Sequence, residues 1–402
     1  MSAPTTTIVR PPSAPGPLRW LRKNLFSTWY NALLTVLALA LIYFVGKGVI
    51  HWAFFEANWD PVRYSLKLFA VGQYPPEQIW RIGLILALAS FLFGLSARVW
   101  GGTIRNFALA LAVALGALAL LPADLSPLGP TGRLWLAVAP LLAVGGYLLG
   151  FTPVGKGRWA LLGWLLSFVL MIVLLNGVGG ISWLPRIDSG LWGGLLLTFL
   201  LALVGIVGCF PFGVLLALGR RSSLPVVKLF CIAFIETVRG VPLVTILFMF
   251  SIILPLFLPE GIRVDRVVRA MLGMTFFASA YMAENVRGGL QAIPRGQFEA
   301  AKALGLNGFQ TTALIVLPQA LRLVIPAIVG QFIALFMDTT LAYIVGLTEL
   351  LTVGKIVLQS NTEWLFLDME VFLFVAAVFW LFTYSMSYAS RRLEKALGVG
   401  SR

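Results

Sequence analysis

Carboxylate and guanidinium groups lie inside the apolar stretches of the second half of this sequence. Glu236 and Arg239 are three residues apart, and Glu284 and Arg287 repeat that spacing. In a helix this spacing places the two members of a pair on one face. Charged side chains are costly inside a membrane and often mark a pathway or an interhelical contact. Two interpretations follow: structural ion pairs near helix ends, or residues of a gate or substrate pathway.

Asp338 lies near the middle of another apolar stretch, and two threonines follow it. An isolated carboxylate at that depth should face a cavity or a partner. A zwitterionic amino acid needs an acceptor for its ammonium group, which Asp338 or Glu236 could supply. Thr339 and Thr340 could then hydrogen-bond the carboxylate of the same molecule. The competing interpretation is that Asp338 only makes a hydrogen bond between helices.

Residue types that perform covalent chemistry are scarce. His51 is the only histidine, and Cys209 and Cys231 lie in apolar segments as small buried residues. Residues 150–157 nearly match a phosphate-binding loop, but Gly157 stands where Ser or Thr should bind Mg²⁺, and no strand precedes the run. We therefore expect no catalytic residue, no metal site and no cofactor bound by this chain. Its energy should come from a partner or an ion gradient.

Composition predicts the elements that must position these groups. The chain of 402 residues is 59% hydrophobic and 11% charged, whereas soluble domains carry about 25% charged residues. Apolar runs of about 20 residues indicate transmembrane helices, and we expect an all-α bundle. Ten spans are expected near residues 30–49, 79–97, 104–122, 133–151, 159–180, 190–219, 225–257, 267–289, 326–349 and 368–390.

Net charge is +14, which in a soluble protein would suggest nucleic-acid binding. Here most Lys and Arg residues lie at the ends of apolar runs, so we interpret them as topology signals and lipid-headgroup contacts, with no nucleic-acid partner. If the N-terminus is inside, the inner segments carry 19 Lys and Arg residues and the outer segments 10. This bias predicts that both termini are cytoplasmic.

The chain divides near residue 185, because the first five spans hold almost no ionisable residue and polar groups enter the spans only from residue 190 onward. The first block is expected to face lipid or act as a scaffold. Residues 51–78 form the longest outer loop, in which an interfacial helix is plausible. The expected parts are a cytoplasmic tail 1–28, an accessory block 29–185, a core 186–392 with a cytoplasmic loop 291–325, and a cytoplasmic tail 393–402.

The loop before the ninth span carries helix signals. Pro294 suits a first helical position, and Gly305 suits the left-handed residue that ends a helix. Asn307 and Gln310 have the spacing of a capping box for a second helix, which Pro318 is expected to break. These signals predict a helix–turn–helix exposed to the cytoplasm. It is either a solvated connection or a docking element whose small residues admit close approach of a partner.

The same segment resembles the "EAA" loop of type I ABC importer permeases, in which EAA is followed by three residues, Gly, nine residues and I-x-L-P. The matching positions are Glu299, Ala300, Ala301, Gly305, Ile315, Leu317 and Pro318. The resemblance implies that these residues form a coupling helix that docks on a separate ATPase subunit. ATP and Mg²⁺ would be used by that ATPase, expected in two copies, and the chain itself would not be an enzyme.

The resemblance extends over residues 190–392. Residues 236–243, 280–289 and 338–341 look like the polar amino-acid branch of these permeases, although Met337 stands where many members have a lysine. The long N-terminal block resembles the M-type permease of general L-amino acid importers.

This family implies a bacterial inner-membrane importer subunit. Its implied partners are a second homologous permease in a heterodimer and a periplasmic amino-acid-binding protein, which would dock near residues 182–189, 258–266 and 350–366. The alternative is an ion-coupled secondary transporter. That class favours similar halves and a midplane ion site, whereas the two halves here differ in polarity.

Overall fold

The structure is a computed structural model that describes residues 16–153 and 155–398. In these residues the regular elements are all helices. There are also two isolated β-bridges, Gly72 with Trp192 and Gly194 with Glu349. The predicted all-α class is confirmed. The chain forms two separate units, which divide after Asn58.

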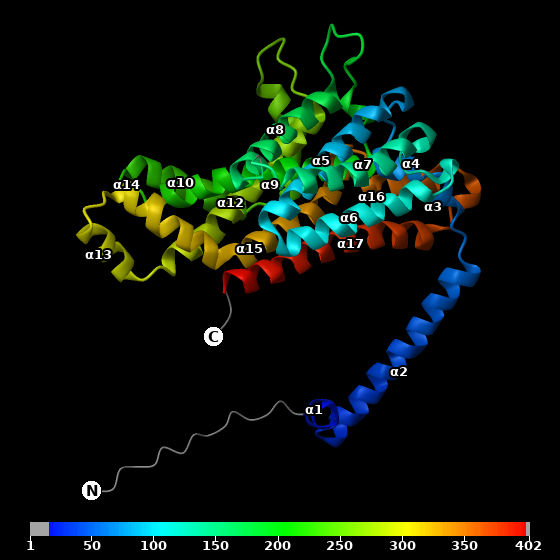
Figure 1. The fold of residues 1–402 in the computed structure, drawn as a ribbon, viewed down its shortest axis with the longest axis horizontal. Helices are drawn as coiled ribbons and strands as arrows, with labels where there is room; N and C mark the ends of the chain where they lie inside the picture. The colour runs from blue at the N-terminus through cyan, green and yellow to red at the C-terminus, as the bar shows by residue number, and fades with distance from the viewer. Residues whose placement is uncertain (1–15, 154, 399–402) are drawn as a thin grey trace. The chain divides into compact units, whose positions relative to one another are not determined.

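The first unit contains the short helix α1 (Pro17–Asn24) and the long helix α2 (Trp29–His51), which continues into the π-helical turn η1 (Trp52–Glu56). The side-chain oxygen of Thr28 accepts a hydrogen bond from the Asn31 N–H, so it caps the start of α2. Figure 1 shows α2 as one long helix in blue. None of the α2 residues, all of which are described, is buried.

The second unit begins with two short helices and four long ones. These are α3 (Asp60–Tyr64), α4 (Leu66–Val71), α5 (Ile79–Trp100), α6 (Gly102–Leu120), α7 (Gly129–Leu149) and α8 (Gly157–Asn176). Helices α5 and α7 pack closely because glycines admit the neighbouring backbone. A Cβ at Gly146 would lie 2.0 Å from the Phe91 carbonyl oxygen, and one at Gly94 would lie 1.9 Å from the Ala143 carbonyl oxygen.

Residues 51–78, where an interfacial helix is plausible, contain the short helices α3 and α4. Val62 of α3 and Phe69 of α4 are buried in a hydrophobic cluster with residues of α16 (Leu350–Gln359) and α17 (Asp368–Leu397). The Phe69 ring also contacts the Phe374 ring. Val62 and Phe69 therefore attach α3 and α4 to the C-terminal helices.

Arg81 is a charged residue inside the accessory block. It lies in α5 with no exposed surface, and its guanidinium donates to the Leu174 carbonyl at 3.2 Å and to the Pro185 carbonyl at 2.9 Å. The Gln78 side chain accepts a third hydrogen bond. Arg81 therefore ties α5 to the end of α8 and to the segment that leads into the core.

The remaining helices form the core. They are α9 (Gly194–Gly219), α10 (Pro225–Arg239), α11 (Leu243–Phe248), α12 (Arg266–Gln291), α13 (Arg295–Ala303), α14 (Gly308–Gln310), α15 (Leu317–Asp338), α16 and α17, with short 3-10 or π segments between some of them. Helix α12 packs along α9 and α15 (Figure 1) and buries half of its residues, including Met274, Met282 and Val286. It is the central helix of this part.

The expected span count needs one correction. Among residues 16–153 and 155–398, eight helical stretches are long and apolar enough to cross a membrane. The stretch expected as one span at 225–257 is not a straight helix, because α10 and the stretch Leu243–Phe257 meet at 108°. Pro242 is the N-cap of α11 and has no N–H to continue α10. Counting the bent pair as one span gives nine.

Helix α12 occupies the span expected at 267–289 and is 26 residues long, but it is too polar to count among the apolar spans. The stretch expected at 326–349 begins earlier, because the helical run extends over Gly308–Val345. Helix α12 tolerates its polar residues because neighbouring helices bury it.

The glycine contacts between α5 and α7 predict a sharp difference between two adjacent positions. Gly146→Ala should lower the free energy of unfolding by about 1–3 kcal/mol, because its Cβ cannot fit beside Phe91. Gly145→Ala should be neutral or slightly stabilising, because no atom lies within 4 Å of a Cβ there. Thermal unfolding of the detergent-purified chain measures both variants. Equal destabilisation would contradict the packing described here.

Candidate functional site

The first helix of the predicted helix–turn–helix is α13. Pro294 is its N-cap, one residue before the expected first helical position. At its end the Gly305 N–H donates to the Lys302 carbonyl and the Leu306 N–H to the Ala301 carbonyl, which is the Schellman pattern. Gly305 has a φ of 77°, so it takes the left-handed conformation expected for it.

The second helix begins with the expected capping box. The Asn307 side chain accepts from the Gln310 N–H at 2.8 Å, and the Gln310 side chain accepts from the Asn307 N–H at 3.0 Å. Pro318, however, does not end this helix. The π-helical turn Thr311–Val316 comes directly before α15, in which Pro318 is in the first turn. The extra residue in a π turn relieves the clash that a proline ring makes with the preceding turn.

The residues that match the EAA pattern differ in exposure. Glu299, Ala300, Gly305 and Pro318 are exposed, Ile315 and Leu317 are half-buried, and Ala301 is buried. Two apolar side chains of the same segment are unusually open, Leu304 at 78% and Phe309 at 82% exposed. Exposed apolar patches often mark interaction sites. The turn between α13 and α14 therefore presents apolar side chains beside Glu299.

A hydrogen bond and a cation–π contact help connect α13 to the rest of the core. The Gln319 side chain of α15 donates to the Gln297 side chain at 3.0 Å. The Arg221 guanidinium lies over the Phe298 ring, 6.0 Å from its centre, and donates to the Leu290 carbonyl at 3.3 Å. The sequence analysis gave no role to Arg221 or Gln319. Gln319 is a polar residue in a mostly apolar run, which could have identified it.

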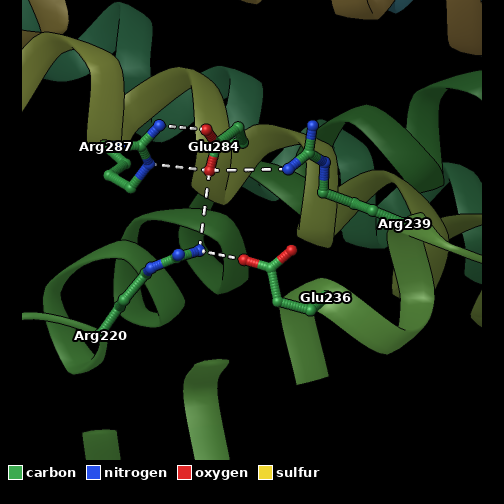
Figure 2. Close-up of polar contacts among 5 residues, drawn as sticks. All are labelled: Arg220, Glu236, Arg239, Glu284 and Arg287. Atoms are coloured by element: carbon green, nitrogen blue, oxygen red, sulfur yellow. Dashed lines mark hydrogen bonds and ion pairs between the residues drawn. The ribbon is translucent and has the colours of Figure 1, made fainter. Parts of the chain in front are cut away.

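Figure 2 shows charged side chains from α10, from α12 and from the residue that follows α9, which meet in one place. Arg287 makes a two-pronged contact with Glu284, with 2.8 Å between its Nε and one carboxylate oxygen. Arg239 and Arg220 approach Glu284 at 3.7 and 3.8 Å. Arg220, which caps the end of α9, also pairs with Glu236 at 2.8 Å. We call these five residues the charge cluster.

The cluster corrects one expected pairing and confirms another. Glu284 and Arg287 pair within α12 as their spacing predicts. In the described part of the chain, Glu236 is paired with Arg220 and not with Arg239, which turns to Glu284. The sequence missed Arg220 because it lies just after an apolar run, where basic residues are also topology signals. Three arginines share two carboxylates, so the cluster is positively charged.

Asp338 and its two threonines lie at the far end of α15. Across the two described ranges, half-buried Asp338 has no hydrogen bond or ion pair. Thr339 is buried and donates to the Phe336 carbonyl, and Thr340 donates to the Met337 carbonyl. An open apolar cavity of about 280 Å³ is lined by Met337, Thr340, Leu351, Phe372, Val375, Ala376 and Phe379. Of the residues expected in a substrate pathway, Thr340 is among those that line this cavity.

Comparison with known proteins gives this geometry a context. Residues 209–399 match the family described as "Binding-protein-dependent transport system inner membrane component". The chain is 38% identical to the inner membrane amino-acid ABC transporter permease protein YhdY of Escherichia coli K12, over 95% of this chain and 93% of the relative.

Two further relatives differ in length. The chain is 38% identical to the glutamate/glutamine/aspartate/asparagine transport system permease protein BztC of Rhodobacter capsulatus, over 96% of this chain and 95% of that protein. It is 37% identical to the probable glutamine ABC transporter permease protein GlnP of Bacillus subtilis, over 51% of this chain and 92% of that protein. Thus half of this chain aligns with nearly the whole of GlnP.

A solved structure, the crystal structure of an amino acid ABC transporter with histidines, aligns with 28% identity and a TM-score of 0.46. The alignment covers 50% of this chain and 92% of that one.

The charge cluster predicts unequal effects for its two carboxylates. Glu284→Gln should lower the free energy of unfolding by about 2 kcal/mol, because three guanidinium groups lose their shared partner. Glu236→Gln should cost less than about 1 kcal/mol, because Glu236 is 54% exposed and has one ion pair. Thermal unfolding compares them directly. Equal losses would show that Glu284 is not the centre of the cluster.

Proposed function

We propose that α13 and α14 form the element on which an ATPase subunit docks to drive transport. The chain belongs to the family of amino-acid ABC transporter permeases. The chain is a multi-pass inner-membrane permease subunit. Nucleotide binding in such a transporter belongs to a partner ATPase, and the relatives are named as permeases rather than enzymes. Membership of this family favours ATP-driven import over the ion-coupled alternative.

The observation that carries the proposal is the open surface of α13 and α14. Glu299 and Ala300 are exposed on α13, with Leu304 and Phe309 beside the Gly305 turn. Large apolar side chains that enter a partner's pocket supply much of the binding energy of an interface. Ala300 adds little bulk, so a partner can approach the helix backbone closely. The matching spacing of the EAA pattern supports docking of the ATPase on this surface.

Movement of α13 can reach the spans by three routes. Only Ala292–Pro294 separate it from α12. The Gln297–Gln319 hydrogen bond connects it to α15. Phe298 lies under Arg221, which follows α9 and also holds the end of α12 through the Leu290 carbonyl. A partner that displaces α13 therefore pulls on α9, α12 and α15 together.

The charge cluster is proposed as the gate at the coupling end of the spans. Glu284 lies two turns before the end of α12, and its arginine partners belong to the ends of α9 and α10 and to α12 itself. Side chains of the cluster are 24–54% exposed. They can therefore exchange ion-pair partners without leaving an unpaired charge buried in the protein. We propose that these ion pairs hold α9, α10 and α12 together in one state and rearrange in the other.

At the other end of α15, Asp338 is proposed to receive the ammonium group of the substrate. Its carboxylate has no partner among the described residues, and Thr340 lines the neighbouring cavity. Thr339 and Thr340 remain candidates for the substrate carboxylate, although both hydroxyls already donate to backbone carbonyls. Relatives named for glutamate, glutamine, aspartate and asparagine suggest a polar L-amino acid as cargo.

The proposed assembly follows from the family and the charge bias. Two ATPase copies would bind on the cytoplasmic side, where both termini are expected to lie, and a second, different permease would complete the pathway. A binding protein would deliver the amino acid to the outer segments 182–189, 258–266 and 350–366. Helix α16 occupies part of the last segment. Residues 29–185 would serve as an accessory block that braces the core 186–392.

Reconstitution tests the coupling role. Proteoliposomes with this chain, the partner ATPase, the second permease and the binding protein should take up amino acid with binding-protein-stimulated ATP hydrolysis. Glu299→Lys and Gly305→Val should each reduce uptake per ATP by about tenfold, because one alters the docking surface and the other strains the turn. Gly296→Ala is the control, because its Cβ would have no atom within 4 Å.

Normal transport by both variants would refute the coupling role. Uptake by this chain alone, driven by an ion gradient, would refute the ABC mechanism. Capture of amino acid by the binding protein should be unchanged in every case.

The connections behind α13 predict a second, milder effect. Gln319→Ala and Arg221→Ala should each lower uptake per ATP about three- to tenfold while ATPase binding is retained, because a lost hydrogen bond or cation–π contact is worth about 1 kcal/mol. Gln291→Ala and Lys228→Ala are matched controls on exposed positions. If the Glu299 and Gly305 variants uncouple transport but the Gln319 and Arg221 variants do not, the docking role is supported. Transmission through Gln319 and Arg221 is then wrong.

A further inference from the structure

Helix α1 has basic side chains on one side and apolar side chains on the other. Arg19, Arg22 and Lys23 fall within about 100° of arc around the helix, whereas Leu18, Trp20 and Leu21 occupy the opposite side. All six side chains are exposed, and Leu18 is 84% exposed. In water this arrangement would leave three large apolar side chains on a helix of only 8 residues. Separated basic and apolar faces are typical of helices that lie in a membrane surface.

Hydrogen bonds fix the distance between α1 and the long helix that follows. The Thr35 hydroxyl of α2 donates to the Leu25 carbonyl at 2.9 Å, and the Asn31 side chain donates to the Ser27 hydroxyl at 2.8 Å. Leu25 is the residue directly after α1. The connection therefore folds back along α2, and the end of α1 is level with Thr35 rather than with the start of α2.

The length of α2 indicates how deep in the membrane the end of α1 lies. The stretch Trp29–Glu56 has 28 residues, which gives about 42 Å of helix and matches the roughly 40–45 Å of a bilayer with its headgroups. Thr35 lies about 9 Å along that helix from Trp29. Because the headgroup zone is about 5–8 Å deep on each side, the end of α1 is held at the boundary between headgroups and acyl chains. Exposed Trp29 and Tyr30 suit the headgroup level.

We propose that α1 lies flat in the membrane surface and binds anionic phospholipid. Leu18, Trp20 and Leu21 enter the acyl boundary, and Arg19, Arg22 and Lys23 contact the phosphate groups. Basic side chains beside a span gain energy from an anionic leaflet. The helix thereby fixes the depth of α2. This proposal concerns residues outside the coupling segment and does not depend on it.

The test places a spin label on each face of α1 in the full-length chain. Cys209→Ala and Cys231→Ala remove the two native cysteines. Leu18→Cys or Arg19→Cys then carries a nitroxide in nanodiscs of phosphatidylcholine with phosphatidylglycerol. Accessibility to oxygen should exceed that to a water-soluble nickel complex at position 18, and the order should reverse at position 19.

Lipid charge provides the second arm of the test. Without phosphatidylglycerol, or with Arg22→Gln and Lys23→Gln, the position-18 label should become more accessible to nickel. The matched control is Arg391→Gln with Arg392→Gln, two exposed arginines at the other end of the chain, and should leave that label protected. Nickel access at both positions in anionic nanodiscs would show a solvated helix. Protection of both positions from oxygen and nickel would show that protein, not lipid, covers α1. Either result overturns the proposal.

Discussion

The ion pairs of Glu284 are the interaction on which the end of the core next to α13 depends. One carboxylate on α12 contacts arginines from the end of α9, from α10 and from α12 itself. Without it, three guanidinium groups would repel one another where three helices converge. With it, the ends of those helices are held in one arrangement, from which α13 leaves after a three-residue connection. The cluster therefore lies near the end of α12 that leads into α13.

The centre of the core obeys a different constraint, which is close packing around α12. Residues with little or no side chain let α9 and α15 approach it. A Cβ at Gly213 would lie 2.5 Å from Met282, and one at Gly289 would lie 2.5 Å from the Ala320 carbonyl oxygen. Bulk is excluded at these positions, so the helices fit in few relative arrangements. A packed interface of this kind switches between discrete states rather than deforming smoothly, which suits an alternating-access protein.

Local signals in the sequence predicted local structure well. The left-handed Gly305 and the Asn307–Gln310 capping box depend only on neighbouring residues, and both form as expected. The all-α class followed from composition. The EAA spacing identified the family because every fixed position is present in one short segment. The coupling and pathway roles of the individual residues are still predictions, since geometry alone does not test them.

What the sequence did not show depends on contacts between distant segments. Hydropathy averages over Gly240–Pro242, so it hid the bend between α10 and α11. Phe69 packs on helices almost 300 residues away in sequence, and no local pattern marks that contact. Arg220 was ambiguous for a similar reason, because a basic residue after an apolar run serves either topology or an ion pair. Only the meeting of α9, α10 and α12 decides between them.

The two ends of α13 differ in their contacts with the core, and this bears on how force would pass through it. Gln297 and Phe298 lie near its start and are attached to the core. Leu304 and Gly305 lie at its end, exposed to solvent. A load applied at the exposed end would act about 10 Å from the attached end, so α13 would work as a short lever. A rigid helix transmits such a load, whereas a flexible loop would absorb it. The Schellman pattern at Gly305 and the capping box at Asn307 keep both helices intact up to the turn, and this explains why glycine is needed there even though no neighbouring atom would obstruct a side chain.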